Sequence, residues 1–200
     1  MASVRILHAS DLHIAAVENI TSPADRFTPG TIKDAALNRM LASSYDSSIL
    51  LHLAKFAHQQ AELGRLDAIL LTGDIATTGS SEDLRKAHEF IHAPVDPDLG
   101  WQTAAGEARL GDVNSFVWLL PGNHDRFRAR AYGYAPGGKA FDLVFSDDWK
   151  GPVQTYGFLR KPGLTVSVIA ADFNLHTSDD ADRWFGSLAQ GKVYDEILDE

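Results

Sequence analysis

Residues that could bind a metal ion or take part in catalysis stand in three short groups, each directly after an apolar run. Asp11 and His13 follow the first run, Asp74 follows the second, and the tetrapeptide Gly-Asn-His-Asp at 122–125 follows the third. Carboxylate, amide and imidazole side chains are ligands that suit Mn²⁺, Fe and Zn²⁺. A tight turn needs a proline and a glycine, but not three consecutive polar side chains, so the third group is the most informative.

Three strands and two helices are expected to position these groups. Strands are predicted at 4–9, at 66–74 and within 115–125, where apolar residues run into polar turns. An apolar helical stripe at 49–63 and a helix start at 80–83 separate them. This alternation implies right-handed crossovers and a largely parallel sheet. Because ligands bind beyond the carboxyl ends of such strands, the three polar groups should converge on one edge.

The remaining sequence supplies the core faces and the connecting segments. The first helix should end at Gly64 and bury a stripe of apolar residues, namely Ile49, Leu50, Leu53, Phe56, Ala57 and Leu63. The second helix should bury Leu84, Ala87, Phe90 and Ile91. Beyond these we expect a helix near 32–41, a surface insertion at 93–115, strands at 141–145, 153–159 and 164–171, and a final helix after them.

The composition fits one soluble α/β domain that spans residues 1–200. The net charge of −9 provides no overall basic field, so a nucleic-acid partner is not expected. The chain has no cysteine, so any metal would be held by oxygen and imidazole ligands. No segment resembles a signal peptide or reaches the ~18 consecutive apolar residues of a membrane span, and we therefore expect a cytoplasmic protein that does not contact a membrane.

The order of the motifs D-x-H, G-D and G-N-H-D resembles the pattern of the calcineurin-like metallophosphoesterase superfamily, over roughly residues 4–190. This superfamily includes serine/threonine phosphatases, cyclic-nucleotide phosphodiesterases and SbcD-like nucleases. The resemblance implies an α/β fold, a four-layer α/β/β/α sandwich, and hydrolysis of phosphate esters with two divalent cations. Two such cations supply a nucleophile at neutral pH and offset the charge of the transition state.

The resemblance also implies a role for the residues of each motif. Asp11 and His13 would hold the first cation. Asp74 would bridge the two cations, and Gly73 would let its backbone approach closely. Asn123 would bind the second cation through its side-chain oxygen. Mn²⁺ is the expected metal, with Fe and Zn²⁺ as alternatives.

The proton-transfer group implied by the resemblance is His124, which would protonate the leaving group and be oriented by Asp125. The expected substrate is a small phosphomonoester or phosphodiester. The segments "LLTGDIATTGSSEDL" and "LLPGNHDRF" look most like bacterial enzymes related to cyclic-nucleotide phosphodiesterases. One alternative is a nuclease, because "ILHASDLHI" is similar to the opening of SbcD-like proteins. The other is a non-catalytic interaction module on the same fold.

The ligand set implied by the resemblance is only partly present. The family pattern includes a further strand-end histidine and a later G-H-x-H motif, whereas this sequence has no G-H pair and no H-x-H. We therefore expect the domain to be incomplete at its C-terminus. The favoured explanation is a piece of a longer precursor. The others are a half-domain completed by a second chain, and a scaffold that lacks some ligands.

Each polar group also has a structural interpretation when it is taken alone. Asp11 could cap a helix, Asp74 could be an ordinary turn residue, and 123–125 could form a polar turn. Arg126 and Arg128 could contact phosphate or neutralise the acidic edge. The other histidines are expected to be structural or exposed, or to have no role in the family pattern: His8, His52, His58, His88, His92 and His176.

Overall fold

A parallel three-stranded sheet forms the centre of the fold. The computed structural model describes residues 2–16, 47–77, 79–98, 100–103, 106–111, 113, 116–126 and 139–174. Its first sheet contains β1 (Ile6–Ser10), β2 (Ala68–Thr72) and β3 (Phe116–Leu120) in that order, with every pair parallel. Their last residues are in register, because Ser10 pairs with Thr72, which pairs with Leu120. The strands therefore end level, and the predicted convergence of the polar groups is confirmed.

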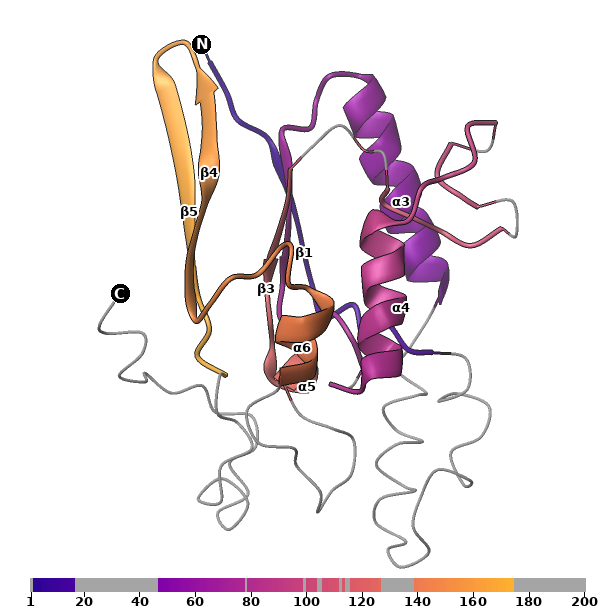
Figure 1. Cartoon of the computed structure of the whole chain (residues 1–200). Coiled ribbons are helices and arrows are strands. Elements are labelled where there is room, and N and C mark those ends of the chain that lie inside the picture. The colour runs from indigo at the N-terminus through magenta and orange to yellow at the C-terminus, as the bar shows by residue number, and fades with distance from the viewer. Residues whose placement is uncertain are drawn as a thin grey trace, which may run out of the picture.

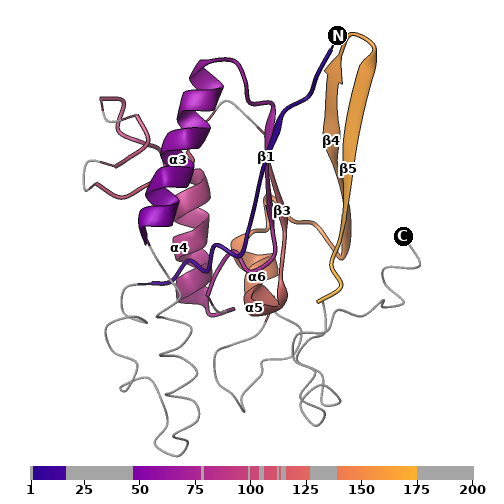
Figure 2. The ribbon, with the colours of Figure 1, turned by 180° about the vertical axis from the view of Figure 1, so that it is seen from behind.

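Two helices cover one face of this sheet (Figures 1 and 2). The helix α3 (Ser47–Glu62) ends two residues before Gly64, whose φ of 62° is the left-handed conformation common just after a helix C-terminus. The helix α4 (Ser81–His92) begins at Ser80, whose hydroxyl accepts a hydrogen bond from Asp83 N at 3.2 Å. Both helices were predicted, and α4 buries the four apolar residues expected of it.

A hairpin lies on the opposite side of the sheet (Figures 1 and 2). It consists of β4 (Val153–Lys161) and β5 (Leu164–Ala171), paired antiparallel. Its Tyr156 hydroxyl accepts a hydrogen bond from Leu119 N at 3.0 Å and donates to Leu119 O, so the hairpin is attached to β3. The predicted strands at 153–159 and 164–171 are confirmed. The described residues form three of the layers expected of an α/β/β/α sandwich, and the α/β fold with two sheets is confirmed.

The buried stripe of α3 is rotated relative to the predicted one. Leu50, Ala54 and Ala57 are buried, whereas Ile49 and Phe56 are 54% and 49% exposed. Positions 50, 54 and 57 follow the i, i+4, i+7 spacing of one helix face, and two of them are alanines that let the helix approach the sheet closely. Leu63, also expected in the stripe, is exposed as well.

The prediction of a strand at 141–145 is wrong, because this segment lies in the helix α6 (Lys139–Val144) and its C-terminal turn. Phe141 and Phe145 are fully buried with ring centroids 4.7 Å apart, and Phe145 N donates to Phe141 O at 2.9 Å. Leu143, which would share their face in a strand, is 76% exposed. The aromatic pair therefore follows helical rather than strand spacing.

Two further expectations need correction. The strand β1 was expected to be buried, but its residues alternate between exposed and half-buried, and Ile6 is 37% exposed. The segment 93–115 is not only a surface insertion, because Leu110 belongs to the core and a Cβ at Gly111 would lie 1.9 Å from Ala93 O.

The helix near 32–41 and the final helix after β5 lie outside the described residues. Among the helices that are described, none combines the length and the apolar content needed to cross a bilayer.

Candidate metal centre

Three residues at the carboxyl ends of β1 and β2 have backbone conformations that L-amino acids rarely adopt. Asp11, His13 and Asp74 have φ angles of 56°, 49° and 47°, and no other non-glycine residue that the structure describes has a positive φ. Such conformations persist where the surroundings enforce them, and they cluster at functional sites. The three strained positions are those to which the sequence assigned the first cation and the bridge.

Hydrogen bonds between the two strand ends hold this backbone in place. Asp11 N donates to Gly73 O at 3.1 Å, and His13 N donates to Asp74 O at 2.9 Å. The Thr77 hydroxyl donates to His13 O. The two loops are therefore joined through the candidate ligand residues themselves, and this restricts where their side chains can point.

The side chains of Asp11, His13 and Asp74 come together at this edge. One candidate ligand atom of each lies within 4.8 Å of the other two. His13 Nδ1 is buried and has no hydrogen-bond partner among the described residues. A buried polar atom without a partner costs ~1–3 kcal/mol, and a bound cation would remove that cost. Two carboxylates and an imidazole also suit Mn²⁺, Fe or Zn²⁺, so the residues present fit a divalent cation.

The protonation state favoured for His13 is the one that a metal ligand needs. Burial lowers the pKa of His13, and the neighbouring His124 lowers it further, whereas Asp74 and Asp11 act in the opposite direction. The ring centroids of the two histidines are 4.9 Å apart, in an edge-to-face arrangement. The lowered pKa favours the neutral ring, which is the form that binds metals.

The loop after β3 reaches the same edge through Gly122. A Cβ at this position would lie 2.2 Å from Asp74 N and 2.3 Å from Asp74 Oδ1, so only glycine fits. The close approach that the sequence attributed to Gly73 therefore belongs to Gly122, while Gly73 supplies a left-handed turn with φ 70°. Asn123 follows directly as the first residue of the short helix α5 (Asn123–Arg126). Its chain neighbours on both sides contact Asp74, which places Asn123 beside the candidate ligands.

His124 is held by two hydrogen bonds. Its backbone N donates to Asp74 Oδ1 at 2.9 Å, and its Nδ1 lies 2.9 Å from Thr77 O. Because a carbonyl can only accept, Nδ1 carries a hydrogen, and Nε2 is the atom at which the ring can gain or lose a proton. The sequence offered no signal for the contribution of Thr77, since the group that acts is a main-chain carbonyl.

Asp125 has a different task from the one the sequence suggested. Its carboxylate is fully buried and accepts hydrogen bonds from Ile75 N, Ala76 N and Gly122 N at 3.1, 2.7 and 2.8 Å. Burial raises the pKa of Asp125 to about 7, although the three N–H groups act to lower it. The group that receives His124 Nδ1 is Thr77 O, so Asp125 holds the loops after β2 and β3 together rather than orienting the imidazole.

Arg126 neutralises buried acid at this end of the fold. Its Nε donates to Asp172 Oδ2 at 2.8 Å and its Nη1 donates to Asp142 Oδ1 at 2.8 Å. Arg126 is 1% exposed and Asp172 is 0% exposed, so the ion pair is part of the interior. Of the two roles open to Arg126, the structure therefore supports neutralisation of acid. Arg128 and His176 lie outside the described residues.

The chain was also compared with known proteins. The family model for calcineurin-like phosphoesterases matches residues 4–196. No curated protein matches the chain.

Proposed function

The chain belongs to the calcineurin-like phosphoesterase family, and on this premise we propose that it hydrolyses small phosphodiesters at the carboxyl edge of the β1–β2–β3 sheet. The observation that carries the proposal is the coincidence at Asp11, His13 and Asp74. These three residues share strained backbones, their donor atoms are grouped, and His13 Nδ1 is buried without a partner among the described residues. A purely structural turn has no need of this combination.

The ligand roles are those that the family pattern implies, and the grouping of Asp11, His13 and Asp74 supports them. Asp11 and His13 would hold one cation, Asp74 would contact both, and Asn123 would contribute an amide oxygen to the second. The bound cations would supply a nucleophile at neutral pH and offset charge on the phosphoryl group. We propose Mn²⁺ as the metal, because two carboxylates and an amide are oxygen donors of the kind that this ion accepts.

The imidazole of His124 would act on the leaving group. With Nδ1 held by Thr77 O, the proton available for transfer sits on Nε2 of the imidazolium. When that proton passes to the leaving oxygen, the ring becomes neutral and keeps its hydrogen bond to Thr77. The hydrogen bond from His124 N to Asp74 Oδ1 couples the position of His124, the proposed acid, to that of Asp74, the proposed bridging ligand.

The diester preference rests on the likeness of the segments at 70–84 and 119–127 to cyclic-nucleotide phosphodiesterase-like enzymes. The net charge of −9 weighs against a nucleic-acid substrate, which would need a basic surface for its phosphates.

Hydrolysis of synthetic esters tests the proposal. The chain is stripped with a chelator and assayed with bis(p-nitrophenyl) phosphate and p-nitrophenyl phosphate, with and without Mn²⁺. We expect Mn²⁺-dependent hydrolysis of the diester, its loss in Asp74→Asn, and its retention in Asp98→Asn, a matched change at an exposed acid. Hydrolysis of the monoester alone would overturn the diester preference. Inactivity toward both esters with Mn²⁺, Fe²⁺ and Zn²⁺ would favour the non-catalytic alternative.

A further inference from the structure

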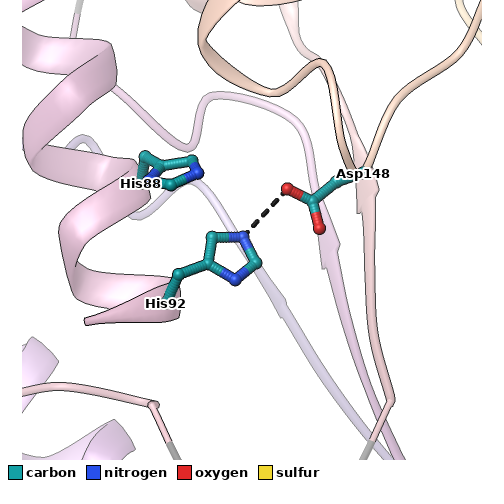
Figure 3. A group of neighbouring side chains, drawn as sticks. All are labelled: His88, His92 and Asp148. Carbon is teal, nitrogen blue, oxygen red and sulfur yellow. Dashed lines mark hydrogen bonds and ion pairs between the residues drawn. The ribbon is translucent and has the colours of Figure 1, made fainter. Parts of the chain in front are cut away.

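A second group of side chains that could hold a metal ion lies away from the strand edge. His88 and His92 belong to the C-terminal half of α4, and Asp148 belongs to the connection between α6 and β4. One candidate ligand atom of each residue lies within 4.8 Å of the other two. Figure 3 shows both imidazoles and the carboxylate turned toward a common space. None of the three residues takes part in the chemistry proposed for the strand edge.

The two histidines are paired by helix geometry. Residues four apart share one face of a helix, and the ring centroids of His88 and His92 are 4.5 Å apart. The ring of His88 also packs against Phe145, with centroids 5.5 Å apart, which restricts its rotation. The pair is therefore arranged before any ion arrives.

The carboxylate of Asp148 is positioned independently of α4. The backbone N of Asp148 donates to Phe145 O at 3.0 Å, and its carbonyl accepts from Gln154 Nε2 at 2.7 Å. Its side chain is 16% exposed, and one of its oxygens lies 2.9 Å from His92 Nε2. A loop held by these two main-chain hydrogen bonds thus presents an acidic oxygen to the imidazole pair.

The direction in which the pKa of His88 moves also suits a cation. Burial lowers the pKa of His88, with a further contribution from His92, while Asp148, Asp147 and Glu89 act to raise it. Two imidazoles this close disfavour double protonation. A neutral ring is the form that ligates metal.

We propose that His88, His92 and Asp148 bind a first-row transition cation of the Zn²⁺ type and so fasten α4 to the α6–β4 connection. Two imidazoles and a carboxylate, with water as the fourth ligand, form a common tetrahedral Zn²⁺ donor set. With metal–ligand distances of about 2.0–2.2 Å, tetrahedral donors lie roughly 3.3 Å apart, so the His92–Asp148 contact need open by only a few tenths of an ångström.

Zn²⁺ binding by the whole chain tests this site. The chelator-stripped protein is dialysed against buffered Zn²⁺, and bound zinc is measured by elemental analysis in the wild type, His92→Gln and Asp148→Asn. We expect each variant to lose one equivalent of zinc per chain. Two matched changes, Asp98→Asn and His52→Gln, alter exposed residues outside the group, and these variants should bind zinc as the wild type does. Equal zinc content in all five proteins would overturn the site.

A second readout separates this site from the strand edge and from misfolding. In an Asp74→Asn background, Zn²⁺ should still raise Tm, whereas adding His92→Gln should abolish that rise. His92 is 35% exposed, so His92→Gln is expected to fold even if Asp148→Asn does not. A Zn²⁺-dependent rise in Tm that survives the double change would contradict the assignment, whatever the phosphoesterase assay shows.

Discussion

His124 Nδ1 lies 2.9 Å from the main-chain oxygen of Thr77, so a carbonyl of the loop after β2 orients the imidazole carried by the loop after β3. The same loops are joined by His124 N and Asp74 Oδ1 at 2.9 Å. The position of the proposed acid is therefore tied to the position of the proposed bridging ligand. A main-chain acceptor also holds Nδ1 without changing its own charge as pH varies.

Replacing His124 tests its role as the acid. His124→Ala keeps the proposed metal ligands, so Mn²⁺ content should be unchanged while turnover of bis(p-nitrophenyl) phosphate falls by roughly 10²–10⁴-fold. His52→Ala, an exposed change on α3, should leave both quantities at wild-type values. Full turnover in His124→Ala would remove this residue from the mechanism.

Asp125 is expected to contribute to stability through its backbone contacts. Asp125→Asn has nearly the same shape, but its NH₂ group faces N–H donors, so at least one of the three hydrogen bonds is lost. We expect the free energy of unfolding to fall by about 1–3 kcal/mol, measured by urea denaturation. Unchanged stability together with a strong loss of turnover would instead support the orienting role that the sequence suggested.

The glycine at 122 should be irreplaceable. A Cβ there would lie 2.3 Å from Asp74 Oδ1, so Gly122→Ala must displace the candidate ligand or its loop. We expect a loss of about 1–3 kcal/mol of stability and weaker Mn²⁺ binding. Gly151→Ala is the matched control, because a Cβ at Gly151 meets no atom within 4 Å. Equal behaviour of the two variants would contradict the close approach.

The interior ion pair of Arg126 and Asp172 should contribute strongly to the stability of the protein. Asp172→Asn removes the carboxylate that the buried guanidinium contacts at 2.8 Å, and it should destabilise the protein by about 3–5 kcal/mol. The measurement is the urea midpoint at neutral pH. Asp142→Asn removes a partner whose side chain is 43% exposed, so its cost should be much smaller. Similar midpoints for Asp172→Asn and the wild type would contradict the burial of this pair.

The sequence was most informative where chemistry is carried by side chains. Asp11, His13 and Asp74 could be selected because each follows an apolar strand, and the parallel sheet brings the strand ends level. Thr77 could not be selected, because the group that orients His124 is a carbonyl that every residue has. The left-handed backbone at Asp11, His13 and Asp74 was not predicted either, although Asp and His are among the non-glycine residues that adopt it most often.

It was harder to predict which face of an element is buried and which residues far apart in the sequence come together. Phe141 and Phe145 suit either a strand or a helix by spacing, and the exposure of Leu143 and the hydrogen bond from Phe145 N to Phe141 O identify the helix. Small residues such as Ala54 and Ala57 carry little hydrophobic signal, yet they decide which face of α3 is buried. His88 and His92 have visible helical spacing, but Asp148 joins them from 56 residues beyond His92.

Mn²⁺ binding at the strand edge tests the central claim most directly. Chelator-stripped wild type, Asp74→Asn and Asp98→Asn are titrated with Mn²⁺, and free ion is followed by electron paramagnetic resonance. If Asp74 is a ligand, Asp74→Asn should bind at least tenfold more weakly, while Asp98→Asn should match the wild type. Identical Mn²⁺ affinity in the wild type and in Asp74→Asn would contradict a metal centre at the carboxyl edge of β1 and β2.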